Sequence, residues 1–226
     1  MKTNIITVMP TRGLILTEVQ NALDAELASC RQIPMILRTY DLSLPVCRNY
    51  LIETALKLKN WTHILLLDDD VILPKGGLQE LIKLNADISI MDYPIKTIVN
   101  GKQIGTVVYD KDKSVAWAGL GVVLIKRKVF EVLKQPWFVM TQYRTERAQN
   151  GKIGFFVGQS QEVIQLSGGE DTFFYLQARK EKFSVKVAKK IAQHAYIENM
   201  VSPVSNNRYQ SQHKIVKRNK IEGRLV

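Results

Sequence analysis

Cysteine and long apolar runs are both scarce in this sequence. Its 226 residues include 2 cysteines, Cys30 and Cys47, too few for a disulfide framework, so we expect a protein of a reducing compartment. No apolar run approaches the roughly 18 residues that a membrane-spanning helix needs, and the apolar stretch at residues 5–9 is too short for a signal-peptide core. We therefore expect a cytoplasmic protein without a transmembrane segment, whose two thiols fill the core rather than catalyse.

The composition is that of an ordinary globular protein, but the charge is unevenly distributed. Hydrophobic residues make up 46% of the chain and charged residues 23%, which predicts a domain with a sizeable core. The segment from Arg179 to Val226 holds 12 Lys or Arg against 3 Asp or Glu, a net charge of +9, and the rest holds 20 against 18. This basic segment predicts an anionic partner, such as nucleic acid, an acidic glycan or a membrane surface on which the protein lies peripherally. The alternative is a basic surface that merely keeps the protein soluble.

Strand-like and helix-like segments alternate along the first half of the chain. Short apolar runs predict strands, and apolar residues at helical spacing predict helices. Pro45 favours a helix start at residue 44, because proline suits the first turn of a helix. The alternating order predicts an α/β fold with a Rossmann-like, mostly parallel sheet and helices on both faces. The predicted strands are 4–9, 33–37, 64–67 and 87–91, and the predicted helices cover 16–30, 44–58 and 78–84.

The pattern changes in the second half of the chain. Asn100 and Gly101 form a turn signal that predicts a hairpin over residues 95–109. Gly119 and Gly121 interrupt an apolar stretch, which indicates that the backbone passes close to another group there. The polar, glycine-punctuated residues 140–167 are typical of a lid or an acceptor-binding loop. Further segments are predicted as helices at 126–133 and 170–180 and as a strand at 183–187.

The most informative stretch is a triplet of acids, Asp68, Asp69 and Asp70, directly after a buried strand. Three adjacent carboxylates repel one another unless a cation or several hydrogen-bond donors lie among them. Ligands of open α/β sheets bind beyond the carboxyl ends of such strands. Because a strand alternates its faces, we expect Asp68 and Asp70 to point to the same side and Asp69 to point away. Such paired oxygens suit Mg²⁺ or Mn²⁺; a loop with acidic capping residues is the alternative.

Three further clusters contain groups that suit catalysis or ligand binding. Glu170 and Asp171 begin a helix after two glycines, where they either cap the helix or act as a general base. His194 would complete a metal site only if the fold brings it beside Asp70; otherwise it is an ordinary surface or core histidine. Arginines near a phosphate site would neutralise a diphosphate, although any of them also fits an ordinary surface. The residues of that last cluster are Arg48, Asn49, Thr11 and Arg12.

Together these clusters resemble the GT-A nucleotide-sugar glycosyltransferases, in particular glycosyltransferase family 2, in order and spacing over about residues 4–196. Leu66–Pro74 resembles the family's Asp-x-Asp strand, and Pro45–Asn49 resembles the start of its preceding helix. His194 falls where some members carry a third metal ligand. The other stretches that carry the likeness are Pro10–Arg12, Ala118–Gly121, Leu124–Glu131 and Gly169–Phe174. The resemblance implies a GT-A-like domain over 1–196 and a basic C-terminal extension over 197–226.

The resemblance also implies roles for individual residues. Asp70 and His194 would bind Mn²⁺ or Mg²⁺ with the diphosphate of a nucleotide-sugar donor, and Asp68 would contact the nucleoside. Asp171, or Glu170 if the register differs, would deprotonate an acceptor hydroxyl. Thr11, Arg12, Arg48, Asp69 and Gly119 would line the donor site. The sequence departs from the family pattern at Cys47, where alanine is common, and at Lys182, where glycine is usual, and it has no clear nucleotide loop after the second strand.

Two other functions remain open from the sequence alone. A haloacid-dehalogenase-like, Mg²⁺-dependent phosphatase also has an Asp-x-Asp at a strand end, but usually on the first strand rather than the third. A basic nucleic-acid-binding protein without catalysis would explain the basic segment and leave the acidic triplet unexplained. For a glycosyltransferase, the acceptor would be a glycan, a lipid or a modified nucleic acid. The sequence does not identify the sugar, the nucleotide base, the acceptor, the stereochemistry, the oligomeric state or whether Ile-Glu-Gly-Arg at 221–224 is native.

Overall fold

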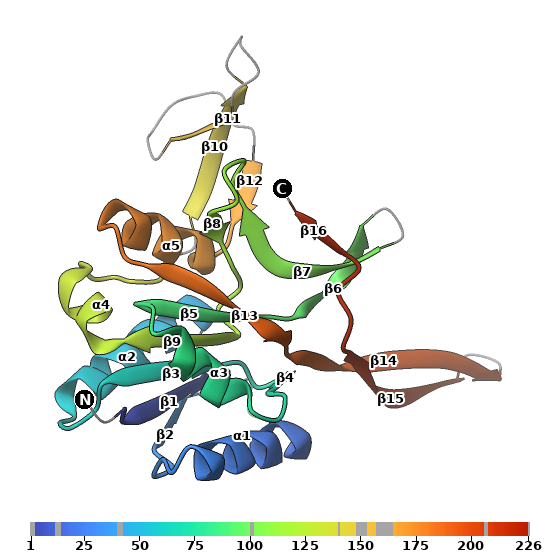
Figure 1. The fold of residues 1–226 in the computed structure, drawn as a ribbon. Helices are drawn as coiled ribbons and strands as arrows, with labels where there is room; N and C mark the ends of the chain where they lie inside the picture. Colours follow the sequence, from blue (N-terminus) through green and yellow to red (C-terminus); the bar gives the residue numbers. More distant parts are fainter. Residues whose placement is uncertain are drawn as a thin grey trace.

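A six-stranded mixed β-sheet forms the centre of the fold, in the order β13-β5-β9-β3-β1-β2 (Figure 1). The computed structural model describes residues 3–11, 15–39, 43–99, 102–139, 141–147, 153–156, 165–205 and 208–225. Only β9 runs against the other strands of this sheet, since it pairs antiparallel with both β3 and β5. The predicted α/β fold with a mostly parallel sheet is therefore confirmed. The strands are β1 (Ile5–Pro10), β2 (Ile36–Thr39), β3 (His63–Leu67), β5 (Ile88–Asp92), β9 (Val122–Lys126) and β13 (Val185–Ile191).

Helices cover both faces of this sheet, as predicted. Successive side chains of a strand point to opposite faces, so Ile64 and Leu66 belong to one core cluster, and Leu65 and Leu67 to the other. The first cluster takes buried residues from α2, α4 and α5, and the second takes them from α1 and α3. The helices are α1 (Thr17–Ser29), α2 (Leu44–Lys57), α3 (Gly77–Leu84), α4 (Arg127–Val132) and α5 (Glu170–Lys180).

The start of α3 is held by a side chain from α1. The carboxylate of Glu26, which is 4% exposed, accepts hydrogen bonds from the backbone N–H groups of Gly76 (2.6 Å) and Leu78 (2.9 Å). The first N–H groups of a helix have no partner within the helix, and a carboxylate also suits the positive end of the helix dipole. Glu26 therefore fixes the turn that follows the acidic triplet. No helix in the described part of the chain is long and apolar enough to span a membrane.

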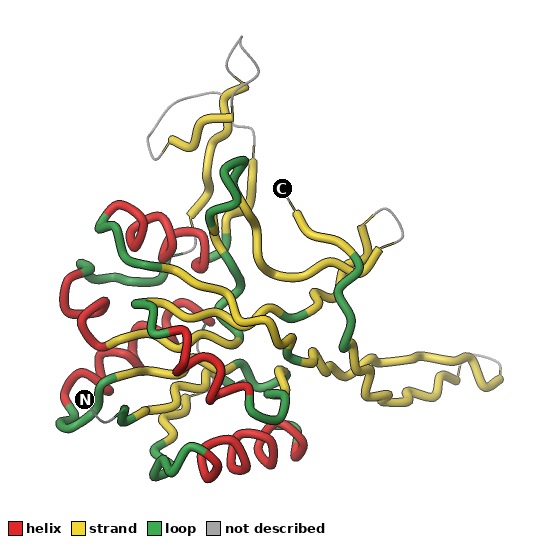
Figure 2. The backbone as a smooth tube through the Cα atoms, viewed as in Figure 1, coloured by secondary structure: helices red, strands yellow, loops and turns green. Residues whose placement is uncertain are grey.

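Three smaller sheets extend from the body, and they consist of strands alone (Figure 2). The predicted hairpin is confirmed as the antiparallel pair β6–β7, although its turn lies outside the described residues. Within the predicted lid, the described residues form β10, β11 and β12 rather than a loop. The strands of these sheets are β4 (Val71–Ile72), β6 (Pro94–Val99), β7 (Lys102–Tyr109), β8 (Val115–Trp117), β10 (Thr141–Arg147), β11 (Ile153–Phe156), β12 (Gln165–Gly168), β14 (Gln193–Ser205), β15 (Arg208–Arg218) and β16 (Gly223–Leu225).

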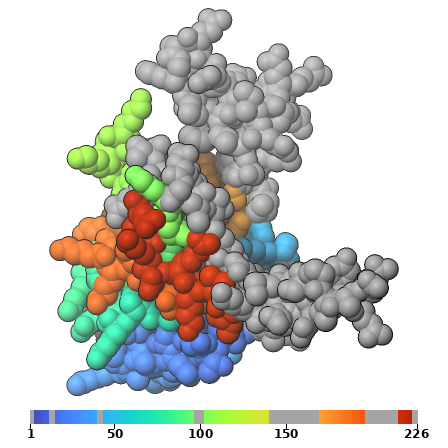
Figure 3. All heavy atoms as spheres, turned by 90° about the vertical axis from the view of Figure 1, so that its right-hand side faces the viewer, coloured from blue at the N-terminus to red at the C-terminus, as the bar shows by residue number. Residues whose placement is uncertain are grey.

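The basic C-terminal segment is built into the fold through backbone pairing. β14 and β15 form an antiparallel hairpin that projects from the body, and the expected boundary after residue 196 falls within β14 (Figure 1). β16 then pairs in parallel with β7. Lys217 forms an ion pair with Glu18 of α1 at 2.9 Å, and in Figure 3 the C-terminal segment (red) lies next to the N-terminal part of the chain (blue). The segment thus contacts both β7 and α1.

Candidate functional site

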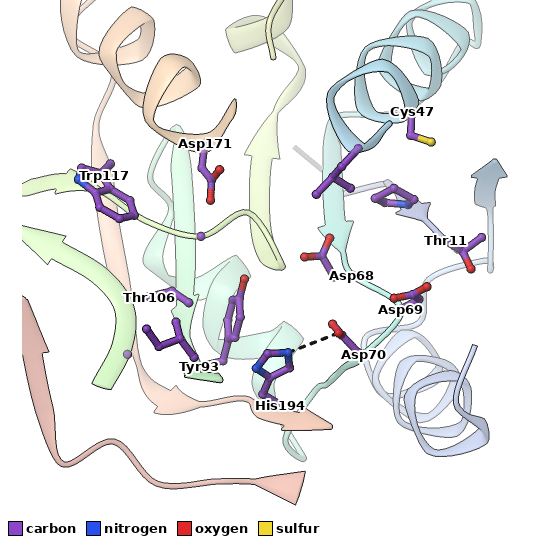
Figure 4. A pocket seen from close by; sticks show the side chains of 15 residues that line it. Thr11, Cys47, Asp68, Asp69, Asp70, Tyr93, Thr106, Trp117, Asp171 and His194 are labelled. Carbon is purple, nitrogen blue, oxygen red and sulfur yellow. Dashed lines mark ion pairs between the residues drawn. The ribbon is translucent and has the colours of Figure 1, made fainter. Parts of the chain in front are cut away.

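A cavity of about 570 Å³ opens beyond the carboxyl ends of β1 and β3, between α2 and the start of α5. It brings together side chains from almost the whole length of the chain (Figure 4). The sequence predictions placed a ligand at this edge of the sheet, and Thr11, Gly119 and Asp171 line the cavity as expected. Arg12 lies outside the described residues. The lining residues are Pro10, Thr11, Leu44, Cys47, Asp68, Asp69, Asp70, Tyr93, Ile95, Gly105, Thr106, Trp117, Gly119, Asp171 and His194.

The acidic triplet forms a tight turn rather than the end of a strand. β3 ends at Leu67, and the N–H of Val71 donates to the carbonyl of Asp68 at 3.3 Å. The prediction that Asp69 faces away from Asp68 and Asp70 was wrong, because strand alternation does not extend into a turn. All three carboxylates line the cavity, and Asp69 lies on the side of Thr11 (Figure 4).

His194 lies beside Asp70, as the metal hypothesis required. Its Nε2 is 3.4 Å from Oδ2 of Asp70, and the backbone N–H of Ala195 donates to the carbonyl of Asp70 at 2.8 Å. The contact arises because the first residues of β14 pair with β4, which follows the acidic turn. On the other side of the ring, Nδ1 lies 2.8 Å from the carbonyl oxygen of Pro94. A carbonyl only accepts hydrogen bonds, so Nδ1 carries a proton, and Nε2 is the ring nitrogen that faces Asp70.

The chemistry of this donor set fits a hard divalent cation. A carboxylate oxygen and an imidazole nitrogen are both ligands for Mn²⁺, and two neighbouring ligands of one octahedral ion at about 2.1 Å lie about 3 Å apart. Among the described residues, no group of three or more His, Cys, Asp or Glu is arranged to hold a metal. Asp70 and His194 would therefore supply two ligands and leave the other positions to water and phosphate oxygens, as is usual for such ions with phosphate substrates.

The charge of the cavity wall also favours a bound cation. Of the described residues, the lining includes four carboxylates and neither Lys nor Arg. A diphosphate would be repelled by such a wall unless a cation lay between them. Burial and the neighbouring carboxylate of Asp70 raise the pKa of Asp68, although Arg48 opposes this shift. Among the described lining residues, carboxylates therefore outnumber cations, an arrangement that suits a bound cation.

Arg48 lies behind the wall of the cavity rather than in it. Its side chain is 2% exposed, and its guanidinium donates to Oδ1 of Asp68 at 2.8 Å and to Oε1 of Glu170. Arg48 does not line the cavity, so the structure does not support the expected direct contact with a donor. Burial lowers the pKa of Arg48, but the two carboxylates outweigh it and raise the pKa above its ordinary value. Arg48 thus stays charged and joins α2, the acidic turn and α5.

The same contact separates the roles of the two acids at the start of α5. Glu170 is buried against Arg48, whereas Asp171 faces the cavity. Burial and the neighbouring Glu170 carboxylate raise the pKa of Asp171 to about 6. A Cβ at Gly169 would lie 2.6 Å from Oδ1 of Asp171, so the glycine before the helix makes room for this carboxylate. Of the two residues, Asp171 is therefore placed to exchange a proton with a ligand.

Tyr93 explains the two glycines that interrupt the apolar stretch. Its hydroxyl accepts a hydrogen bond from the N–H of Gly121 at 3.2 Å, and a Cβ at Gly119 or Gly121 would lie 2.6 or 2.5 Å from it. The prediction of a close backbone approach there is confirmed. The ring of Tyr93 also contacts His194 edge to face, with centroids 5.6 Å apart. Gly119 therefore shapes the wall by admitting Tyr93.

Several residues of the site gave no signal in the sequence. The carboxylate of Asp92, which is 2% exposed, accepts hydrogen bonds from the N–H groups of Tyr93 (2.9 Å) and Thr106 (2.7 Å), and this ties β7 to the end of β5. A Cβ at Gly105 would lie 2.5 Å from that carboxylate. Trp117 reaches the cavity from β8. Asp92 and Tyr93 stand at the end of a predicted strand, but no local sequence pattern distinguishes them from other strand residues.

Comparison with known proteins supports the fold and leaves the function unassigned. No protein-family model matches the chain, and no curated protein matches it. Among solved structures, A197 from STIV matches with a TM-score of 0.54 and 20% sequence identity, over 98% of this chain and 100% of that one. At this identity the likeness extends to the α/β fold alone.

Proposed function

We propose that this chain is a metal-dependent glycosyltransferase of the GT-A type, which moves a sugar from a nucleoside-diphosphate donor to an acceptor hydroxyl. The observation that carries the proposal is the arrangement of Asp70 and His194, 3.4 Å apart, in the same cavity as the proton-exchanging Asp171. A cation ligand pair and a general base in one cavity are the two elements that such a transfer requires. The resemblance of the sequence to glycosyltransferase family 2 supports the same function.

In this mechanism Asp70 and His194 would hold Mn²⁺ or Mg²⁺ together with the donor diphosphate. The bound cation would stabilise the charge that develops on the leaving nucleoside diphosphate. Asp68, together with Asp69 on the side of Thr11, would position the nucleoside part of the donor (Figure 4). The acceptor oxygen forms a bond to the anomeric carbon, the bond from that carbon to the diphosphate breaks, and the acceptor proton passes to Asp171.

The raised pKa of Asp171 has a direct consequence for the pH dependence of the transfer rate. Asp171 acts as a base only when it is deprotonated, and its raised pKa of about 6 keeps it a stronger base than an exposed aspartate. A base whose pKa lies near neutrality combines proton affinity with a large deprotonated fraction. Glu170 contributes to this shift from behind the wall, while Arg48 opposes it.

A thermal-shift screen of nucleotide sugars with and without Mn²⁺ tests the proposal, because a ligand that binds only the folded state raises the melting temperature. We expect one donor to stabilise the protein only when Mn²⁺ is present, and Asp70→Ala to abolish donor turnover with the fold intact. Undiminished turnover in Asp70→Ala would contradict the assignment. Release of phosphate rather than nucleoside diphosphate would instead support the phosphatase alternative.

A further inference from the structure

A second cavity, of about 540 Å³, lies between the C-terminal end of α5, the first half of β13 and the turn that joins β7 to β8. Its floor is apolar and half-buried, and the same apolar residues pack against the main core cluster. The floor is made of Tyr109, Val115, Phe183, Val185 and Val187. The cavity is distinct from the acidic one, since none of its lining residues is shared with it.

Four exposed cations surround this apolar floor: Lys113, Arg179, Lys182 and Lys186. Arg179 is held in place by an ion pair with Asp110 at 2.6 Å, and Lys186 donates to the carbonyl of Leu84 at 3.2 Å. Neither Lys113 nor Lys182 forms an ion pair with any residue that the structure describes. These four cations form the rim of the cavity, and the acids beside them are Asp110, Asp112 and Glu181; Asp110 is paired with Arg179, and Asp112 accepts two hydrogen bonds from Ser114. Four cations against three acids leave these residues a net charge of +1.

Two of the rim lysines occupy backbone positions that usually favour glycine. Lys113 has a φ of 66° and Lys182 a φ of 57°, both in the left-handed region. Lys182 follows the C-terminal end of α5. Its N–H donates to the carbonyl of Arg179, and the N–H of Phe183 donates to the carbonyl of Ala178. In this helix-ending arrangement the position of Lys182 is usually occupied by glycine. A side chain at such a position costs about 1 kcal/mol. At both positions the chain carries a cation over the same cavity instead of the residue that would relieve this strain.

The second cavity adjoins the acceptor side of the first. Trp117 lines the first cavity and Val115 the second. Two residues at this spacing on a strand point to the same face, and their Cα atoms lie about 7 Å apart. Likewise α5 carries Asp171 at one cavity and Arg179 at the other, about 12 Å along the helix. An elongated acceptor with its hydroxyl at Asp171 that extended past Trp117 would therefore reach the cationic rim.

We propose that the second cavity binds an anionic sugar unit of the acceptor, so that the acceptor is an acidic glycan whose carboxylate, sulfate or phosphate group meets the lysine rim. This inference rests on the proposed function, since it extends the acceptor of that reaction. The half-buried apolar side chains of the floor suit the apolar face of a sugar ring, and the rim supplies charge beside it.

The shape of the cavity favours a glycan over the other anionic partners. Single-stranded nucleic acid binds by stacking its bases on exposed aromatic faces, whereas Tyr109 and Phe183 are half-buried and pack against the core cluster. A membrane surface would need apolar side chains that project beyond the cations, whereas here the apolar residues form the floor of a hollow.

Isothermal titration calorimetry on the full chain, without donor, tests this site. The probes are a heparin-derived hexasaccharide, neutral maltohexaose, a twelve-residue oligothymidylate and phosphatidylglycerol vesicles. The test variant is Lys113→Glu with Lys182→Glu, and the matched control is Lys59→Glu with Lys134→Glu, which makes the same charge change at exposed lysines outside both cavities. Thermal melting verifies that each variant folds, and the thermal shift with nucleotide sugars and Mn²⁺ is measured in parallel.

We expect the wild type to bind the acidic hexasaccharide at least about tenfold more tightly than maltohexaose, and the test variant to lose about tenfold while the control loses less than threefold. The Mn²⁺-dependent stabilisation by a nucleotide sugar stays unchanged in both variants. Equal losses in test and control would overturn the proposal, and so would equal binding of the neutral sugar or a test-variant loss confined to oligothymidylate or vesicles. If no nucleotide sugar stabilises the wild type with Mn²⁺, the proposed function is contradicted instead, and the hexasaccharide titration still decides whether the cavity binds an acidic glycan.

Discussion

The guanidinium of Arg48 is buried to 2% exposure and donates hydrogen bonds to Glu170 and to Asp68, 122 and 20 residues away in the sequence. One side chain thereby joins three elements that surround the acidic cavity, α2, the turn after β3 and α5. The Nε of Arg48 has no hydrogen-bond partner among the residues that the structure describes, so the contact depends on its two carboxylates. Removal of the guanidinium would leave Glu170 buried without its cation, and it would leave Asp68, whose side chain is 22% exposed, without its ion pair.

Arg48→Met is therefore expected to destabilise the fold strongly. Loss of one partner of a buried ion pair typically costs about 3–5 kcal/mol, because a charge is left buried and unpaired. Chemical denaturation measures this loss, with Arg38→Met as the control. Arg38 is exposed, so its replacement should change the free energy of unfolding by less than about 0.5 kcal/mol. A loss below about 1 kcal/mol for Arg48→Met would show that the bridge is not structural.

The rate of sugar transfer is expected to rise with pH through about 6. Burial raises the pKa of Asp171 to about 6, so the carboxylate is protonated and inactive as a base below that pH and deprotonated above it. Glu170→Gln removes a neighbouring negative charge, which should move this limb of the profile to lower pH. The measurement is kcat/KM for the acceptor against pH. A profile that is the same in Asp171→Asn and the wild type would exclude Asp171 as the base.

His194→Ala is expected to weaken Mn²⁺ binding in the presence of a nucleoside diphosphate by at least about tenfold, because the ion loses an imidazole ligand. The matched control is His63→Ala, since His63 is a half-buried histidine that does not line the cavity. Calorimetric titration with Mn²⁺ compares the two variants. If both bind Mn²⁺ as the wild type does, the metal site lies elsewhere.

Glu26→Ala is expected to lower the free energy of unfolding by about 1–3 kcal/mol, since hydrogen bonds to a charged group contribute this much and two backbone donors lose their acceptor. The donors are the N–H groups of Gly76 and Leu78, at 2.6 and 2.9 Å. Urea denaturation should show the loss, with Glu53→Ala on an exposed face of α2 as the control. Equal stabilities of the two variants would mean that solvent replaces the Glu26 contact without cost.

Much of the central fold was predictable because its signals are local. Apolar periodicity predicted the helices and most strands of the sheet within a few residues, and the glycines at 119 and 121 predicted a close backbone approach. The strand at β2 begins at Ile36 rather than at Ile33, which is 83% exposed and precedes Pro34. The direction of β9 was not predictable, because an apolar run is the same in a parallel and in an antiparallel pair.

The candidate site was predictable in its members but not in their contacts. The acidic turn, Asp171 and His194 were each visible as short patterns, whereas the position of Arg48 behind the wall depends on how α2 packs against α5. Asp69 was placed on the wrong face because the sequence does not show that the strand ends at Leu67. Trp117 and Asp92 stand in ordinary strands and gave no local signal.

The sequence alone determined the α/β class, the acidic edge of the sheet and the excess of basic residues after Arg179, because these follow from local periodicity and composition. Tertiary structure decided which charges meet. It paired His194 with Asp70 through β14 and β4, and it placed Asp171 in the cavity and Glu170 behind it. It also arranged four basic residues around a separate apolar hollow. Such pairings depend on distances between residues far apart in the chain, which only the packing of the helices and sheets determines.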